Sequence, residues 1–349
     1  MDIKGKFLSL TKKTYPHGTE EFLENFLPEG FEMDGHGNYF LKIGDSRTMF
    51  TCHLDTASSN YEDVVHVFDG DFIRSNGKTI LGADDKAGVV ILLYMIEKRV
   101  PGTYYFFIGE EVGCVGSRRM SREYVDGSYD RCISFDRRGY NSIITHQFWS
   151  RCCSDEFAIS LKSEINKNGL KFDLDDTGIV TDSASFMGQI PECTNISVGY
   201  FNEHTTREMQ DIGFLIKLCS AVSGVDWESL PIGEVDESYF DDWHDDICDD
   251  HRNGTIIGQS EKLQIHIGSE VYIARLKPDR VLEERSLIYD WIISTGSYYD
   301  IKGMEWNGKE CYLYYQNVRE LIGTRTDLIN VIDGLCEIPI SDLVLLEKI

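Results

Sequence analysis

Histidine and carboxylate side chains stand where several apolar segments of this chain end. His53 and Asp55 are two residues apart at the end of the apolar segment 48–54, so in an extended strand both side chains point to the same side. A carboxylate beside a histidine orients the imidazole and makes it a more basic metal ligand. The pair indicates a metal-binding histidine with its orienting aspartate; a hydrogen-bonded histidine at a strand end is the ordinary alternative.

Two adjacent glutamates, Glu110 and Glu111, directly follow the apolar segment 104–108 and lie between Gly109 and Gly113. Adjacent residues at a turn point in different directions, so one carboxylate can bind a metal ion while the other carries protons. The glycines permit close approach of the backbone to a bound group. A solvated acidic loop is an equal alternative at this stage.

The stretch 81–88, LGADDKAG, places Asp84 and Asp85 at the start of an apolar helical segment. A carboxylate near the positive end of a helix can stay ionised while partly buried, as an aspartate shared by two metal ions must. An ordinary helix cap is the competing interpretation.

Two more candidates, Asp136 and His204, follow the apolar segments 132–135 and 194–200. In open α/β sheets, functional groups gather outside the carboxyl ends of the strands. Imidazole and carboxylate groups suit zinc, and a shared aspartate can hold two ions close together. A set of two histidines and three carboxylates is chemically complete for two divalent ions, and the candidates for it are His53, Asp84, Glu110, Glu111, Asp136 and His204.

The elements that must position these groups alternate between strands and helices. This order predicts an α/β layered fold with a mostly parallel mixed sheet and helices on both faces. Strands are expected at 39–43, 48–54, 71–74, 104–108, 132–135, 142–145 and 194–200, and helices at 19–27, 86–98, 155–167 and 208–222.

The last third of the chain differs in character. Residues 234–250 hold nine acids and no Lys or Arg, which is typical of a solvated linker. Beyond it, alternating apolar residues and the turn signal Asn307-Gly308 predict strands and a hairpin. We expect a catalytic domain at 1–231, an acidic linker at 232–250 and a small β-rich domain at 251–349, with an SH3-like barrel as one possible form.

Composition narrows the partners and the compartment. The 349 residues carry a formal net charge of −25, which argues against nucleic acid or an anionic membrane as partner. The chain shows no signal peptide and no apolar stretch of membrane-spanning length, so we expect a cytoplasmic protein. The ten cysteines lack paired zinc-ligand spacing and are expected to be reduced, mostly buried thiols.

Taken in order, the motifs HLDT (53–56), GADDKAG (82–88), GEEVG (109–113), FD (135–136) and NEHT (202–205) resemble the co-catalytic di-zinc exopeptidases. This superfamily includes bacterial aminopeptidases, peptidase T and acylamino-acid deacylases, and the resemblance covers residues 1–230. It implies two divalent ions, zinc first and cobalt or manganese as alternatives. It assigns His53, Asp84 and Asp136 to one ion and Asp84, Glu111 and His204 to the other. Asp55 would orient His53, and Glu110 would be the general base.

Two features depart from the peptidase T branch of that superfamily. The segment between Asp136 and His204 is too short for both core elements and the inserted lid domain of that branch, so we expect no lid. Arg137 and Arg138 follow the metal-ligand candidate Asp136; they are either surface residues or a clamp for a substrate carboxylate. The segment 181–186 resembles one that lines the substrate groove in the aminopeptidase branch, with a serine-rich turn as the alternative.

The predicted function is metal-dependent hydrolysis of a peptide or amide bond by two bridged ions, with an aminopeptidase-type exopeptidase acting on small peptides as the first choice. A deacylase for N-acylated small molecules is the second choice. A catalytically silent binding protein that retains the fold is the third. The C-terminal domain is expected to offer a contact for self-association or for a protein partner.

Overall fold

A computed structural model describes residues 1–124, 127–147 and 150–234 with their side chains, and beyond them the backbone of the strands β15 to β22. The chain divides into two compact units, Met1–Asp241 and Asp242–Ile349. All the candidate site residues lie in the first unit.

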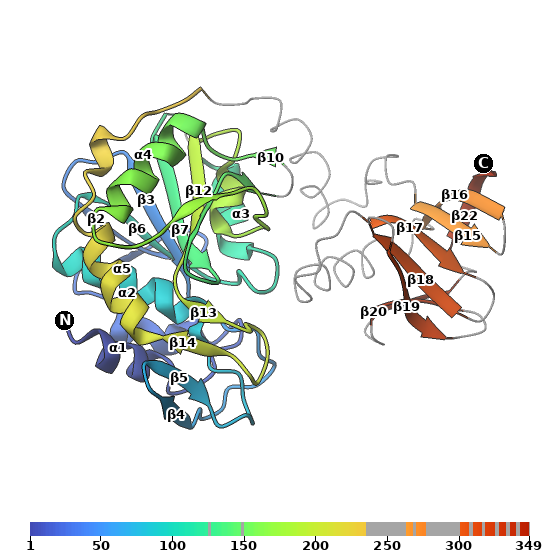
Figure 1. The fold of residues 1–349 in the computed structure, drawn as a ribbon, viewed down its shortest axis with the longest axis horizontal. Helices are drawn as coiled ribbons and strands as arrows, with labels where there is room; N and C mark the ends of the chain where they lie inside the picture. Colours follow the sequence, from blue (N-terminus) through green and yellow to red (C-terminus); the bar gives the residue numbers. More distant parts are fainter. Residues whose placement is uncertain are drawn as a thin grey trace. The chain divides into compact units, whose positions relative to one another are not determined.

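The first unit is built on an eight-stranded mixed sheet (Figure 1). Its four central strands run parallel to one another, and antiparallel strands β1 and β2 complete one edge. Parallel central strands place their carboxyl ends at one edge of the sheet, where ligand sites form. The strand order is β1 (Glu32–Met33), β2 (Tyr39–Ile43), β6 (Gly102–Phe107), β3 (Thr48–His53), β7 (Arg131–Arg137), β12 (Glu192–Ser197), β8 (Ser142–Ile144) and β11 (Asp173–Asp175).

Helices cover both faces of this sheet. On one face, Phe50 of β3 packs edge-on against Trp227, with 4.9 Å between the ring centroids. On the other face, Phe107 of β6 packs against Phe186 at 6.1 Å. The first face carries α1 (Ile3–Leu10), α2 (Ala83–Glu97), α4 (Asp155–Asn166), α5 (Ile212–Val222) and η3 (Trp227–Ser229); the second carries α3 (Val115–Arg122) and the 3₁₀ helix η2 (Asp182–Phe186) (Figure 1).

A second, four-stranded antiparallel sheet brings distant parts of the chain together. Its order is β13 (Tyr200–Phe201), β14 (Met209–Asp211), β5 (Phe72–Ser75) and β4 (His66–Asp69). The loop after β5 leads into α2, and the loop between β13 and β14 carries His204. Pairing of β14 with β5 therefore places these two loops close together. A short hairpin, β9 (His146–Gln147) with β10 (Ser150–Arg151), completes the unit.

Two expectations about elements need correction, and two helices were not predicted. The opening helix expected at 19–27 is a 3₁₀ helix, η1 (Glu20–Phe26), in which Phe22 is 48% exposed and packs on Tyr61. The helix expected from 208 begins at Ile212, since 209–211 pair with β5 as strand β14. The α-helices α1 and α3 were not predicted; α3 (VGSRRMSR) has only two large apolar residues, Val115 and Met120, so no apolar segment marks it in the sequence.

The described strands of the second unit form a six-stranded sheet and a separate two-stranded pair. The predicted strands near 263–267 and 271–276 pair antiparallel, as do the strands that flank the predicted hairpin turn. That turn and most of the acidic linker lie outside the described residues, and the SH3-like barrel stays a prediction. The strands are β15 (Leu263–Ile267), β16 (Glu270–Leu276), β17 (Ile301–Trp306), β18 (Glu310–Tyr315), β19 (Val318–Thr324), β20 (Leu328–Ile332), β21 (Cys336–Pro339) and β22 (Leu343–Lys348).

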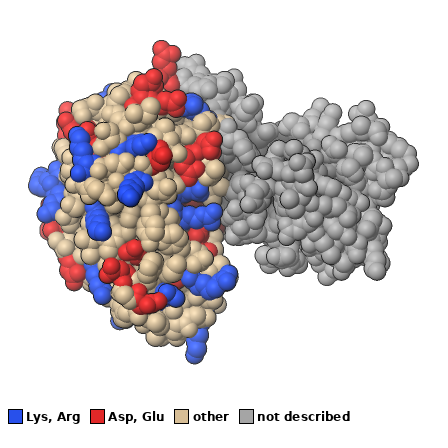
Figure 2. Space-filling view, in the orientation of Figure 1, with Lys and Arg blue, Asp and Glu red and all other residues tan. Residues whose placement is uncertain are grey.

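The described residues can be compared with the composition in their surface charge, their helix hydrophobicity and the state of their cysteines. Figure 2 shows both basic and acidic side chains on this face of the first unit, with several Lys and Arg side chains gathered in its left-hand part. Within the described part of the chain, no helix is long and apolar enough to cross a membrane. The seven cysteines whose side chains are described are free and buried, as expected.

Candidate metal centre

Carboxylates and histidines from five separate segments meet at the carboxyl ends of the parallel strands. His53 ends β3, Glu111 follows β6, and Asp136 lies near the end of β7. Asp84 comes from the start of α2, and His204 from the loop between β13 and β14. The sheet edge thus brings together residues up to 151 positions apart in sequence, the separation of His53 and His204.

The carboxylate of Asp84 lies between the two histidines. Its Oδ1 is 3.0 Å from Nε2 of His53, and its Oδ2 is 3.2 Å from Nε2 of His204. The aspartate is 7% exposed, and His53 is 1% exposed. Each imidazole therefore faces a different oxygen of one buried carboxylate, as a shared aspartate between two ions requires.

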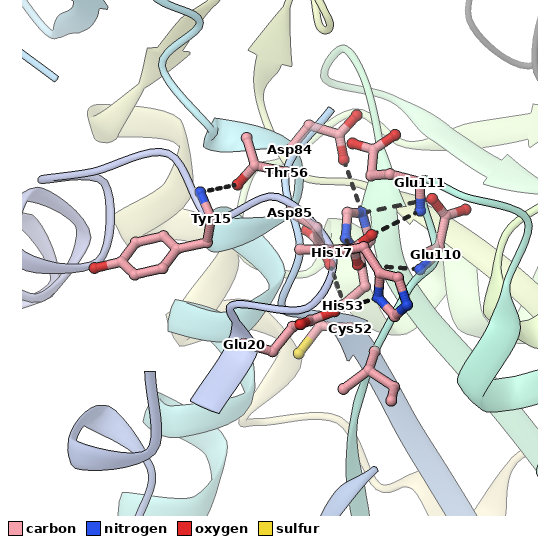
Figure 3. Close-up of polar contacts among 12 residues, drawn as sticks. Tyr15, His17, Glu20, Cys52, His53, Thr56, Asp84, Asp85, Glu110 and Glu111 are labelled. Carbon is pink, nitrogen blue, oxygen red and sulfur yellow. Dashed lines mark hydrogen bonds and ion pairs between the residues drawn. The ribbon is translucent and has the colours of Figure 1, made fainter. Parts of the chain in front are cut away.

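Each histidine also faces a second carboxylate. Nε2 of His53 lies 3.6 Å from Oδ1 of Asp136, and Nε2 of His204 lies 3.0 Å from Oε2 of Glu111. The two sets share Asp84 alone. Figure 3 shows Asp84, Glu111 and His53 turned toward a common space, and these three offer ligand atoms within 4.8 Å of one another.

Glu110, the other glutamate of the pair, also lies near His53. Its Oε2 is 3.9 Å from Nε2 of His53, and the residue is 7% exposed. Asp55 holds the backbone of this turn, since its Oδ1 and Oδ2 accept hydrogen bonds from the N–H groups of Glu110 (3.0 Å) and Glu111 (3.1 Å). Asp55 Oδ1 also lies 3.3 Å from Nδ1 of His53. One buried aspartate thus contacts both the histidine and the glutamate turn.

Burial and mutual charge shift the pKa values of these groups in opposite directions. Burial lowers the pKa of His53, but the carboxylates around it outweigh burial and raise that pKa well above the usual range. Burial raises the pKa of Asp84, but hydrogen bonds to the two histidines lower it overall. Burial first, and then the charge of Asp84, raises the pKa of Asp136 to about 6. Burial chiefly raises the pKa of Glu110 well above its ordinary value.

This donor set fits divalent metal ions. Buried carboxylates outnumber the basic groups near them, and such charges are costly unless cations compensate them. Oε1 of Glu111 is buried and lacks a hydrogen-bond partner among the described residues. Two imidazoles and the three carboxylates of Asp84, Glu111 and Asp136 match the ligands that zinc, cobalt and manganese accept.

Asp85 and Lys86, which follow Asp84 at the start of α2, are buried and make hydrogen bonds to neighbouring segments. Asp85, joined to Asp84 by a cis peptide bond, accepts hydrogen bonds from the N–H groups of His53 (3.2 Å) and Gly88 (2.9 Å). Lys86 is fully buried, and its ammonium donates to the carbonyl oxygen of Asp55 at 2.9 Å. This hydrogen bond ties the start of α2 to the loop that carries Asp55.

Sequence reasoning missed three residues that hold the ligands in place. Tyr200 donates its hydroxyl to the carboxylate of Asp136 at 3.1 Å, and Thr181 donates to the other oxygen at 2.6 Å. Glu208 accepts hydrogen bonds from the backbone of the 81–84 loop. Thr181 belongs to the segment that resembles a groove lining, which was the one available signal; a lone tyrosine and a lone glutamate carried none.

An additional pair, His17 and Glu20, lies beside the glutamate turn (Figure 3). Nδ1 of His17 is 2.6 Å from Oε1 of Glu20, and the second Glu20 oxygen accepts the N–H of Gly18 at 2.6 Å. A side chain at Gly109 would meet the His17 ring at 2.9 Å. The pair thus packs against the turn that carries Glu110.

The two arginines after Asp136 have partners within the chain. Arg137 donates to the carbonyl and hydroxyl oxygens of Thr177 at 3.2 and 3.1 Å. Arg138 is paired with Glu203 at 3.1 Å. These contacts favour local structural roles, and the substrate clamp stays a prediction.

Comparison with solved structures places this architecture among known folds. The aminopeptidase PepT of Bacillus cereus matches with a TM-score of 0.55 and 18% identity, over 64% of this chain and 96% of that one. A tripeptidase of Staphylococcus aureus matches with a TM-score of 0.54, the same identity and the same coverage. The chain therefore shares the fold of this aminopeptidase and this tripeptidase. The resemblance inferred from the five motifs is confirmed at the level of the fold.

Sequence comparison adds one relative. The uncharacterized protein YqjE of Bacillus subtilis is 34% identical over 102 residues. The match spans 27% of this chain and 27% of that protein, so the chain matches about a quarter of its curated relative. No family model matches the chain.

Proposed function

We propose that this chain is a metal-dependent peptidase of the aminopeptidase type that acts on small peptides with two divalent ions, zinc first and cobalt or manganese as alternatives. The observation that carries the proposal is the position of Asp84, whose two oxygens face His53 at 3.0 Å and His204 at 3.2 Å. The shared fold with an aminopeptidase and a tripeptidase supports it.

The ligand groups divide into two sets around Asp84. His53 and Asp136 would complete the site of one ion, and Glu111 and His204 the site of the other. Bound there, the ions would supply Lewis-acid activation of a substrate carbonyl and of a water molecule. Asp55 would hold His53 and the Glu110–Glu111 turn in fixed positions relative to each other.

Glu110 is the residue that moves the proton. Its carboxylate lies in the space shared by the ligands but is more distant from His53 than the carboxylate of Asp84, at 3.9 against 3.0 Å. Its raised pKa makes it a better proton acceptor than an ordinary glutamate. Glu110 would accept a proton from the attacking water and deliver it to the leaving amine nitrogen.

The proposal extends to the organisation of the chain. Residues 1–231 would be the catalytic domain without an inserted lid, 232–250 a linker, and 251–349 an accessory domain. The accessory domain would contact a second copy or another protein. We also propose that the enzyme is cytoplasmic, in keeping with its free, buried thiols.

The test combines metal analysis of the full-length protein with a hydrolysis screen. Matched aminoacyl substrates with a free and with an acylated amine are assayed after supply of zinc, cobalt or manganese. Cleavage of the free-amine series with two bound ions supports the aminopeptidase. Cleavage of the acylated series alone supports the deacylase, and a protein that neither binds metal nor cleaves either series is a binding protein.

A further inference from the structure

Glu208 is a buried glutamate whose carboxylate faces backbone N–H groups rather than the proposed metal ions. The residue is 1% exposed. Its Oε2 accepts hydrogen bonds from the N–H groups of Leu81 (2.8 Å) and Gly82 (2.7 Å), and its Oε1 accepts from the N–H of Asp84 (2.9 Å). Three hydrogen bonds that converge on one buried carboxyl group fix the geometry of the loop that donates them.

The loop can offer three N–H groups to one carboxylate because of its backbone. Gly82 has a φ of +76°, in the left-handed region that favours glycine. The N–H groups on either side of this turn then converge on one point instead of alternating in direction.

The position of Glu208 in the chain links the two ligand segments. It stands four residues after His204 and immediately before β14, which pairs with β13 and β5. Its carboxylate therefore joins the segment that carries His204 to the loop that carries Asp84. The 3.2 Å contact between His204 Nε2 and Asp84 Oδ2 spans the same two segments.

We propose that Glu208 is a positioning residue that holds the backbone of Asp84 so that the two oxygens of Asp84 face His53 and His204. The inference rests on the proposed function, since it assigns Glu208 to the two-ion site. Glu208 would act through the backbone of Asp84 and would not itself be a metal ligand.

The chain offers a matched control in Glu192. This glutamate is also fully buried and also accepts three hydrogen bonds, from the N–H and hydroxyl of Ser154 (2.7 Å each) and the N–H of Gly233 (2.6 Å). It begins β12, at the amino end of the parallel strands and away from the metal centre. Glutamine at either position replaces one acceptor oxygen with an amide that donates.

The experiment compares full-length wild type, Glu208→Gln, Glu208→Asp and Glu192→Gln by titration with cobalt(II), followed by its visible absorption and by competition with a chelator. Loss of a residue that orients a metal ligand typically lowers metal affinity about 10–100-fold. We expect a loss of that size in Glu208→Gln and a smaller one in Glu208→Asp, which keeps both oxygens on a shorter side chain. Glu192→Gln should bind two ions within about twofold of the wild-type affinity, whatever its thermal stability.

Equal cobalt affinity in Glu208→Gln and wild type would overturn the positioning role, as would an equal loss in Glu208→Gln and Glu192→Gln. If Glu208→Gln does not fold, wild-type affinity in Glu208→Asp has the same consequence. These results leave the proposed function intact, because the wild type still binds two ions. A wild-type protein that binds no cobalt instead overturns the proposed function and this inference together.

Discussion

The carboxylate of Asp84 is the point on which the site depends at the scale of single residues. It is buried, it contacts both imidazoles, and its pKa is lowered because the two histidines favour its charged form. Glu110 has the opposite character, since burial raises its pKa. A shared ligand must stay ionised, and the lowered pKa of Asp84 suits that proposed role.

Glu110→Gln should keep both metal ions and lose turnover. Glutamine has nearly the same shape but does not accept the proton from water, and loss of a general base typically costs about 10²–10⁴-fold in rate. Metal content and kcat on an aminoacyl substrate are the measurements. A variant with two ions and wild-type kcat would remove Glu110 from the proposed mechanism.

Asp84→Asn and Asp85→Asn should separate the shared ligand from its neighbour. Asparagine at 84 removes the charge that both histidines face, so both ions are expected to bind more weakly. At 85, the amide keeps one oxygen for a backbone N–H, so binding of two ions should survive with reduced stability. Metal content after dialysis tests this pair; loss of both ions from Asp85→Asn alone would reverse the assignment.

Metal affinity should rise with pH. The pKa values of His53 and His204 are raised well above their usual range, and that of Asp136 to about 6, so the metal-free site holds protons near neutrality. Raised values favour the protonated, metal-free form as pH falls, and metal binding must release those protons. Cobalt titrations at about pH 6 and about pH 8 test this linkage. A cobalt affinity that is equal or lower at the higher pH would contradict it.

At the scale of elements, close packing of α2 on the central strands puts Asp84 at the sheet edge. Gly88, in the first turns of α2, lies where an added Cβ would be 2.3 Å from the carbonyl oxygen of Phe135 in β7. That oxygen belongs to the strand that carries Asp136. Helix and strand therefore approach backbone to backbone directly behind two proposed ligands.

Gly88→Ala should lower both stability and metal affinity. The added methyl group forces α2 away from β7, and overpacking of this kind costs about 1–3 kcal/mol. Gly224→Ala is the control, because its Cβ would meet no atom closer than 3.5 Å. Thermal unfolding and cobalt titration of both variants test the point, and unfolding of Gly88→Ala at the wild-type temperature would contradict it.

At the scale of the whole molecule, every described residue of the site lies in the first compact unit, Met1–Asp241. The end of that unit is anchored beyond the expected boundary at 231. Gly233 donates its N–H to the buried carboxylate of Glu192 at 2.6 Å, and the carbonyl oxygen of Leu230 accepts from buried Arg131 at 2.5 Å. The structure therefore favours a domain end after Gly233.

A chain of residues 1–241 should fold and bind two ions as the full-length protein does. A chain of residues 1–231 should be less stable, because Glu192 loses one of its three donors, and a hydrogen bond to a charged group contributes about 1.5–3 kcal/mol. Thermal unfolding of both chains is the measurement. Equal stability of the two would show that the Gly233 contact contributes nothing.

The residue types and their order along the sequence determined the fold class and the candidate ligands. Strand ends marked by His53, Glu111 and Asp136 are local signals, because a polar residue after an apolar run is visible in sequence. Helix α3 and strand β14 were not predicted, since the first has few apolar residues and the second is a strand only through its pairing with β5.

Only the tertiary structure decided which oxygen of Asp84 faces which histidine, that Lys86 is buried, and that Glu208 holds the 81–84 loop. Glu208 and Asp84 are 124 residues apart in the sequence, and Lys86 and Asp55 are 31 residues apart. The physical cause of these contacts is the pairing of β14 with β5 and the packing of α2 on the parallel strands, and no local sequence pattern encodes either contact.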